Sequence, residues 1–188
     1  MGLVGALGAL VALSAFAALE NGVKAPDFSA KAALDGKEFT YSLSKELNKG
    51  PVVVYFYPSA YTGGCNLQAH TFATKREQFD AAGASIVGVS LDDIGRLKEF
   101  SGDPEYCAGK IPVASDTDGS IAKSYGLKVG AANAAAKDTR GVEIKHGFAE
   151  RTTFIVNKDG TIAATVGGVS PVENVDQALA AVQKLKAK

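Results

Sequence analysis

The sequence is short of cysteine and carries no excess of charge of either sign. Its 188 residues include only two cysteines, Cys65 and Cys107, which are too few for a secreted scaffold held together by disulfides. Their wide separation also matches no zinc ligand pair. Lys and Arg total 20 and Asp and Glu total 20, so we expect no attraction to nucleic acid or to an anionic membrane surface. This balance of charge suits a small neutral substrate. The two cysteines are either inert buried thiols, a structural disulfide or redox-active groups.

Sequence motifs for common cofactors are absent as well. The pair Gly63-Gly64 is not followed by the Lys-Ser/Thr pair that a phosphate-binding loop requires. The sequence contains no heme, flavin or nicotinamide motif and no metal-ligand spacing, so neither a cofactor nor a metal is predicted. The two histidines, His70 and His146, receive no role, because an isolated histidine is more often a surface or hydrogen-bonded side chain than a base.

The first 19 residues are hydrophobic. No charged residue occurs from Gly2 to Leu19, a pattern typical of a short membrane anchor, a buried helix or a secretory signal. Ala15-Phe16-Ala17 has the small-x-small form that signal peptidase requires, although no Lys or Arg precedes the apolar run. We therefore predict export to a periplasm, an organelle lumen or the exterior if residues 1–17 are a cleaved signal. Otherwise the protein is membrane-anchored through residues 3–19 or cytoplasmic.

Residues 24–188 are predicted to form one α/β domain. The run Val52–Tyr57 is β-branched and aromatic, as in a central strand covered on both faces, and Pro58 ends it. A helix is expected from Cys65 to about Ala82. An N-terminal β-hairpin with the turn Asp35-Gly36 precedes both elements.

The remaining elements alternate between strands and helices. Short apolar runs predict strands, amphipathic runs predict helices, and an antiparallel pair should close one edge of the sheet. The expected strands cover residues 28–33, 39–43, 84–90, 111–114, 152–156 and 161–166, and the expected helices cover residues 94–100, 120–125 and 172–187. This order is that of a thioredoxin-like fold, a central mixed β-sheet flanked by helices. Residues 127–150 fit neither pattern and are predicted to be an irregular insertion.

Cys65 occupies a chemically special position. It follows a buried strand through a short loop and starts a helix, so free backbone N–H groups and the helix dipole should favour its thiolate. The Thr62 hydroxyl is able both to donate and to accept hydrogen bonds. Gly63 and Gly64 let the backbone approach closely without side chains in the way. Together these residues predict a reactive thiol in a narrow site.

Those positions resemble the hallmark of the peroxiredoxin family. That hallmark is Pro, three residues, Thr, two residues and Cys after a strand, and Pro58, Thr62 and Cys65 match each fixed position. Three further segments extend the resemblance over residues 24 to 188. Residues 55–58 are similar to the approach to the active site in the bacterioferritin comigratory protein or PrxQ branch, residues 25–28 to the family's N-terminal signature, and residues 151–156 to the strand that brings in its active-site arginine.

The resemblance implies a thiol peroxidase that reduces hydrogen peroxide and organic hydroperoxides. Cys65 would be the peroxidatic nucleophile, and Thr62 would hold the peroxide and the thiolate. Arg151 would stabilise the thiolate and the charge on the leaving oxygen, as an always-charged guanidinium is able to do. Pro58 and Gly64 would form part of the substrate pocket.

Three of these residues also have simpler interpretations. Thr62 fits a helix N-cap, and Pro58 fits a strand terminator. Arg151 fits a surface ion pair with Glu150 or Asp159. The occurrence of all three in this order and spacing, together with Cys65, favours the peroxidase interpretation.

Two positions depart from the pattern of the branch. The position five residues after the peroxidatic cysteine, where many members carry the resolving cysteine, is His70, and the position three after, often Glu, is Gln68. Residues 111–116 resemble the strand and turn that a resolving cysteine precedes in other members. The resemblance therefore implies a Cys65–Cys107 disulfide that a thioredoxin-like or other thiol reductant recycles. The alternatives are a one-cysteine peroxidase in which Cys107 is merely buried, and a non-catalytic binding or holdase module.

Three further points concern an alternative activity, substrate preference and oligomeric state. A thioredoxin-like disulfide reductase is disfavoured, because Gly64 and Asn66 flank a single cysteine instead of a Cys-x-x-Cys pair. Tyr61 and Phe148 are candidate rim residues that would bias the site towards apolar hydroperoxides. The sequence is compatible with a monomer or a homodimer.

Overall fold

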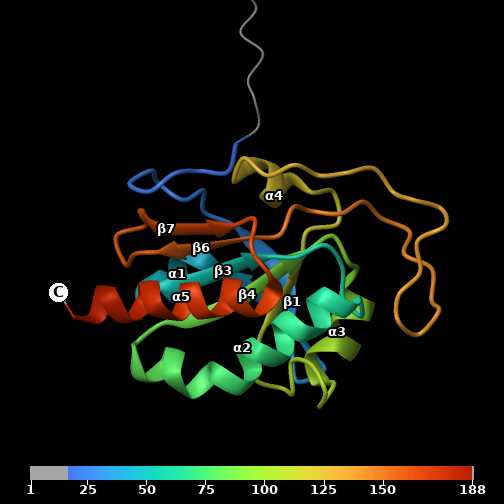
Figure 1. The fold of residues 1–188 in the computed structure, drawn as a ribbon, viewed down its shortest axis with the longest axis horizontal. Coiled ribbons are helices and arrows are strands. Elements are labelled where there is room, and N and C mark those ends of the chain that lie inside the picture. The colour runs from blue at the N-terminus through green and yellow to red at the C-terminus, as the bar shows by residue number, and fades with distance from the viewer. Residues whose placement is uncertain (1–16, 188) are drawn as a thin grey trace, which may run out of the picture.

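The computed structural model describes residues 17–187, and its centre is a seven-stranded mixed sheet with helices on both faces (Figure 1). The strand order is β2-β1-β5-β4-β3-β6-β7. The strands are β1 (Ser29–Leu34), β2 (Lys37–Ser42), β3 (Val52–Phe56), β4 (Ser85–Ser90), β5 (Val113–Ser115), β6 (Thr152–Val156) and β7 (Ile162–Gly167). The helices are α1 (Leu43–Leu47), α2 (Gly63–Ala81), α3 (Ile94–Gly102), α4 (Ser120–Ser124) and α5 (Pro171–Lys186).

Strand β3 lies in the interior of this sheet, next to the central strand β4. All five of its residues are buried, and it pairs parallel with β4 on one side and antiparallel with β6 on the other. A strand that has helices over both faces has no solvent side, which is why its residues are apolar throughout instead of alternating. The loop that follows β3 therefore leaves from the most constrained part of the sheet.

The helices form two layers, each with its own hydrophobic cluster. Helices α2, α3 and α5 cover one face of the sheet, where Phe72, Leu97 and Val175 pack together. Helices α1 and α4 cover the other face through Leu43 and Ala122. In Figure 1, α2 and α5 run next to each other on one side of the sheet and α4 lies on the other. Both cysteines belong to the cluster under α2, α3 and α5, so the two thiols lie on the same side of the sheet.

The observed elements agree with the predicted thioredoxin-like fold, with end points shifted by a few residues. Helix α1 was not predicted, because five residues are too short for a helical hydrophobic period to be visible. The expectation of one antiparallel edge was incomplete, since the N-terminal hairpin joins the sheet by pairing antiparallel with β5. The sheet therefore has antiparallel pairs at both edges.

The N-terminal segment is described only from residue 17 onward. Residues 1–16, and with them nearly all of the predicted signal or anchor, lie outside the described residues. Leu19 packs on the fold, because its N–H donates to the Tyr125 carbonyl at 3.2 Å and its own carbonyl accepts from Thr165 Oγ1 at 2.7 Å. Within residues 17–187, every helix is too short or too polar to cross a membrane.

Candidate functional site

Three chain segments meet at one end of the central strands. Strands β3 and β4 are parallel, so the residues that follow Phe56 and Ser90 emerge at the same edge of the sheet. Strand β6 runs in the opposite direction, and its first residue, Thr152, pairs with Phe56. The residue just before β6, Arg151, therefore lies beside the loop that leaves β3 and leads to Cys65.

Cys65 lies in the first turn of α2. The helix begins at Gly63 with Thr62 as the N-cap residue, and the Cys65 N–H donates to the Thr62 carbonyl at 2.9 Å. The Cys65 side chain is only 2% exposed. A sulfur at this position faces the positive end of the helix dipole, where an anion is favoured.

The Thr62 side chain does not cap the helix. Its Oγ1 donates to the Ser59 carbonyl at 2.8 Å, and the helix has no side-chain cap hydrogen bond. The simpler interpretation of Thr62 is therefore correct for its position but not for its hydroxyl. The hydroxyl closes the turn between β3 and α2.

Arg151 contacts the Cys65 sulfur directly. Its Nη2 donates to Cys65 Sγ at 3.3 Å, and its Nη1 donates to Gln68 Oε1. The guanidinium thus spans two residues of α2 instead of pairing with Glu150 or Asp159. The contact places an always-charged guanidinium beside the sulfur.

A chain of buried side chains fixes the position of Arg151. Gln68 is fully buried, and its Nε2 donates to Asn174 Oδ1 at 2.9 Å. Asn174 in α5 is also fully buried, and its Nδ2 donates to the Val166 carbonyl at 3.0 Å. Thr153 Oγ1 donates to the same Asn174 oxygen. Asn174 was not among the predicted site residues, although the sequence carries a signal for it, since this polar residue lies among the apolar positions of α5 that face the sheet.

Gly64 and Pro58 shape the path of the loop. A side-chain carbon at Gly64 would lie 3.1 Å from Arg151 Nη2 and 3.4 Å from Pro171 Cγ, which is tighter than most real contacts of that kind. Glycine thus lets the backbone approach the guanidinium. Pro58 is half-buried at the end of β3, where the predicted strand terminator stands.

Cys107 lies in a very different environment. It belongs to the turn-rich segment that follows α3, it is fully buried, and it shares a hydrophobic cluster with Cys65. Both cysteines are free thiols. Burial raises the pKa of the Cys107 thiol, and the nearby negative charge of Asp103 raises it further.

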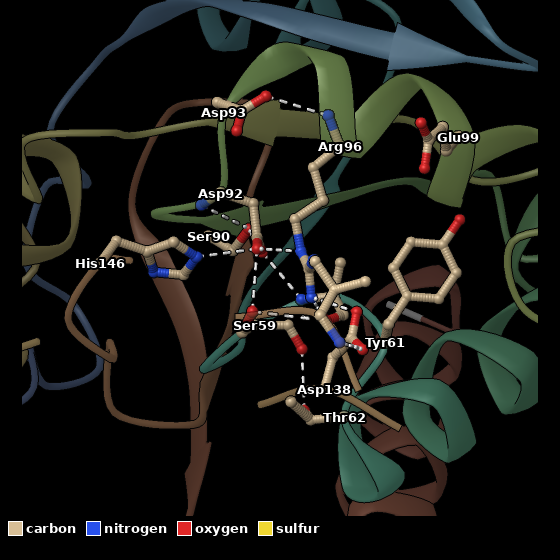
Figure 2. Close-up of polar contacts among 12 residues, drawn as sticks. Ser59, Tyr61, Thr62, Ser90, Asp92, Asp93, Arg96, Glu99, Asp138 and His146 are labelled. Atoms are coloured by element: carbon tan, nitrogen blue, oxygen red, sulfur yellow. Dashed lines mark hydrogen bonds and ion pairs between the residues drawn. The ribbon is translucent and has the colours of Figure 1, made fainter. Parts of the chain in front are cut away.

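A second polar cluster lies behind the loop that leaves β3, and it is centred on Asp92 (Figure 2). Asp92 is fully buried and accepts hydrogen bonds from Ser59 Oγ at 2.8 Å, the Ala60 N–H at 2.8 Å and Ser90 Oγ at 2.7 Å. Burial opposes its ionisation, but these hydrogen bonds and one from His146 hold the pKa of Asp92 below its ordinary value. Asp92 was not predicted as a site residue, although it follows a buried strand at the same edge as Pro58.

The two candidate rim residues are placed differently from each other. Tyr61 is only 2% exposed, so the expectation that it lines an open rim is wrong, and its ring packs edge-on against Phe100 and Tyr106. Phe148 is half-buried and packs edge-on against His146. Within residues 17–187, no cluster of three or more His, Cys, Asp or Glu side chains has the geometry to bind a metal ion.

Comparison with known proteins identifies the family. The model of the AhpC/TSA family matches residues 21–165. This chain belongs to the AhpC/TSA family. A chloroplastic peroxiredoxin Q of Populus jackii is 34% identical to it over 173 residues, which cover 90% of this chain and 71% of the relative. A putative peroxiredoxin of Mycobacterium tuberculosis is 30% identical over 145 residues, covering 77% of this chain and 85% of the relative.

Solved structures agree with this assignment. The peroxidoxin BcpB of Mycobacterium tuberculosis superposes with a TM-score of 0.72 and 27% identity, covering 89% of this chain and 98% of the other. The bacterioferritin comigratory protein of Xanthomonas campestris gives a TM-score of 0.65 and 25% identity, covering 83% and 91%. As a peroxiredoxin, the protein is a thiol-dependent peroxidase and hence an oxidoreductase.

Proposed function

We propose that Cys65 is the peroxidatic nucleophile and that the protein reduces hydrogen peroxide and organic hydroperoxides. The observation that carries the proposal is the contact between Arg151 Nη2 and Cys65 Sγ at 3.3 Å, in the first turn of α2. A thiol beside a guanidinium and a helix N-terminus is poised to react as a thiolate. The Xanthomonas campestris relative is described by its alkyl peroxide reduction activity, which supports organic hydroperoxides as substrates here.

The first step is a nucleophilic displacement at oxygen. The Cys65 thiolate attacks one peroxide oxygen, an S–O bond forms and the O–O bond breaks, so that the sulfur is oxidised to a sulfenic acid. The leaving hydroxide or alkoxide takes up a proton and departs as water or alcohol. Arg151 stabilises the charge on the leaving oxygen, and the Gln68 contact holds the guanidinium in place for this task. The proposed role of Thr62, Pro58 and Gly64 is to shape the pocket that holds the peroxide.

The second step is a disulfide between the two cysteines. The Cys107 sulfur attacks the sulfenic acid, an S–S bond forms, the S–O bond breaks and water leaves. A thioredoxin-like dithiol then reduces the disulfide to two thiols. The position of Cys107 in the same hydrophobic cluster as Cys65 supports this pairing, and full burial of Cys107 means that the local structure must open first.

A one-cysteine mechanism is the second candidate. Its support is the apolar burial of Cys107, whose raised pKa keeps it a neutral thiol and a poor nucleophile in the closed structure. In that case an external thiol attacks the Cys65 sulfenic acid directly, and Cys107 is a core residue.

Export or membrane anchoring by the N-terminal segment is a separate proposal. Its support is the uncharged run from Gly2 to Leu19 and the chloroplastic location named for relatives such as peroxiredoxin Q. Mass spectrometry of the protein purified from its native cells tests it. A mature chain that begins at Ala18 supports a cleaved signal, whereas an intact chain in the membrane fraction supports an anchor through residues 3–19.

Peptide mapping under non-reducing conditions tests the proposed chemistry. The protein is treated with one equivalent of hydrogen peroxide and compared with Cys65→Ser and Cys107→Ala. A Cys65–Cys107 linked peptide in the parent protein alone supports the two-cysteine mechanism. Oxygen adducts on Cys65 with Cys107 untouched support the one-cysteine mechanism, and an unreactive Cys65 contradicts both.

A further inference from the structure

The long segment between α4 and β6, residues 127–150, is folded back on itself although it contains no strand or helix. Its two arms pair closely at the base, where the Gly130 N–H donates to the Phe148 carbonyl at 2.9 Å. They pair again near the tip, where the Ile144 N–H donates to the Ala136 carbonyl at 2.9 Å. Figure 1 shows this segment as the gold and orange loop that runs out and back beside the sheet. These contacts hold the two arms of the segment together.

The first attachment is at Tyr61, whose backbone is strained. Tyr61 has a φ of 59°, in the left-handed region that a bulky aromatic residue rarely adopts. Such a conformation persists only where the surroundings hold it. The Tyr61 carbonyl accepts two hydrogen bonds from Thr139, one from its N–H and one from its Oγ1, both at 2.9 Å. The Arg140 guanidinium carbon lies 3.3 Å from the centre of the Tyr61 ring, which adds a cation–π contact.

The second attachment is at Ser59 and Ala60, and it runs through Asp92. His146 Nε2 lies 2.8 Å from Asp92 Oδ1, while His146 Nδ1 lies 2.8 Å from the Gly147 carbonyl. A carboxylate and a carbonyl only accept hydrogen bonds, so these two neighbours favour an imidazole that donates from both ring nitrogens. Figure 2 shows the His146 ring directed at Asp92, which in turn holds Ser59.

Arg96 connects the two attachments. Its Nη2 donates to the Ala60 carbonyl at 2.7 Å and lies 3.0 Å from Asp138 Oδ2, and its Nε lies 2.9 Å from Asp92 Oδ1. Asp138 also accepts from the side chain of Arg140. The arginine therefore ties α3, residues 138–140 and the loop after β3 into one polar network.

From these contacts we propose that residues 138–146 act as a clamp on the loop Ser59–Thr62. The clamp holds this loop in the conformation in which Cys65 attacks peroxide. It also opposes the local opening that lets Cys65 reach Cys107. The first half of the proposal concerns the reaction of Cys65 with peroxide. The second half rests on the proposed Cys65–Cys107 disulfide. Thr139, Arg140 and His146 are positioning residues, since their contacts are with Tyr61 and Asp92 and they act on Cys65 through the loop.

The clamp predicts opposite changes in two rates. A weaker clamp misplaces the loop, and we expect the rate constant of Cys65 oxidation to fall about tenfold, since small misplacements of reacting groups cost rate steeply. The same weaker clamp frees the first turn of α2, so the rate of disulfide formation after oxidation should rise severalfold. A purely structural defect would lower both rates together.

The test compares two single variants, Thr139→Val and Arg140→Ala, with the parent protein. Each reaction is stopped by rapid acid quench, the remaining thiols are alkylated, and the intact mass is measured. Thr139→Val is nearly isosteric and removes the side-chain donor, whereas Thr139→Ser keeps the donor and should restore parent rates. Lys145→Ala is the matched control, because Lys145 is exposed on the same segment. Each variant is measured with both cysteines present and again in a Cys107→Ala background, where only Cys65 oxidation is followed.

The outcomes separate the clamp from the proposed function. Slower Cys65 oxidation in both backgrounds, with faster disulfide formation and rescue by Thr139→Ser, is the expected result. Unchanged rates, or two rates that fall together, overturn the clamp while the parent protein still reacts with peroxide. If the parent protein itself shows no oxidation of Cys65 by peroxide, the proposed function fails instead.

Discussion

The two cysteines of this peroxiredoxin lie in the same hydrophobic cluster but in opposite chemical environments. Cys65 is 2% exposed, lies at a helix N-terminus and accepts a hydrogen bond from Arg151. Cys107 is fully buried, and both burial and the negative charge of Asp103 raise the pKa of its thiol. Burial alone therefore does not distinguish the two thiols. The charge and the hydrogen-bond donors beside each sulfur do.

This contrast fits a division of labour. In the proposed mechanism the first thiol attacks the peroxide while the site is closed. In the same mechanism the second thiol stays neutral and shielded until a sulfenic acid exists, because an exposed thiolate would be oxidised in the same way. Four substitutions test how far the difference between the two environments reaches.

Removal of the Arg151 guanidinium should greatly lower the rate at which Cys65 reacts with peroxide. We expect Arg151→Leu to lower the rate constant for hydrogen peroxide about 10² to 10³-fold, the usual loss when one charge-stabilising donor is removed from an active site. Arg151→Lys keeps the charge but lacks the planar fork that spans Cys65 and Gln68, so it should recover only part of the rate. Stopped-flow measurement of peroxide consumption compares the three proteins. Equal rates would remove Arg151 from the mechanism.

The apolar environment of Cys107 should make a hydroxyl at this position destabilising. Cys107→Ser places a hydroxyl among apolar neighbours, and an unsatisfied buried polar group costs about 1–3 kcal/mol of stability. Cys107→Ala is the matched control without the hydroxyl. Urea denaturation should therefore show Cys107→Ser as the less stable of the pair, while equal stabilities would mean that Cys107 has a polar partner or access to water.

The buried contacts of Arg151 predict a smaller loss. Gln68→Met keeps the size of the side chain but removes its bonds to Arg151 and Asn174. We expect the rate of Cys65 oxidation to fall about tenfold, or about 1.4 kcal/mol, because the guanidinium is then less well positioned. Gln78→Met changes an exposed residue of the same helix and is the control. A fall of the same size in both variants would point to the helix and not to Arg151.

The smallest expected effect is the pH dependence of His146. Burial disfavours the charged ring, but hydrogen bonds to Asp92 and the Gly147 carbonyl outweigh burial and the repulsion from Arg96, so the pKa of His146 is raised above 6.5. Because this pKa is raised, protonation of His146 adds to the free energy of unfolding. That contribution is fully present below pH 6.5 and is lost as the pH rises through the pKa of the folded state.

Stability measurements of His146→Gln across this pH range check the sign. The glutamine retains a donor for Asp92 but does not titrate. The parent protein should therefore exceed the variant in unfolding free energy most clearly at acid pH, and the gap should narrow as the pH rises. A constant gap would show that folding does not shift the pKa of His146, and a gap that widens with pH would show that folding lowers it; either result contradicts the prediction.

The fold was predictable because it depends on local patterns. The run Val52–Tyr57 predicts a buried strand from its own composition. The position of Cys65 between that strand and a helical pattern places it in the first turn of a helix. Arg151 was assigned through the family resemblance, and its contact with Cys65 comes from the antiparallel pairing of β6 with β3. That pairing joins residues that lie far apart in the chain.

The network around the loop could not be predicted in the same way. Asp92, His146 and Tyr61 come from three separate segments, and their contacts depend on where residues 127–150 pack, which no periodic pattern specifies. The strained φ of Tyr61 also has no signal in the sequence, since glycine, the usual residue for that conformation, is absent at this position. Sequence patterns thus predicted the place of Cys65 in the first turn of a helix but not the contacts that hold the loop before it.

The most direct test of the central claim is the rate at which Cys65 alone reacts with hydrogen peroxide. The Cys107→Ala protein is mixed with peroxide in the presence of dimedone, which traps sulfenic acid, and the adduct on Cys65 is followed by mass spectrometry. We predict an adduct that forms in proportion to peroxide and at least about a thousandfold faster than on free N-acetylcysteine, the lower end of the acceleration expected from positioned charge and orientation. A Cys65 that reacts no faster than the free thiol would contradict its assignment as the peroxidatic nucleophile.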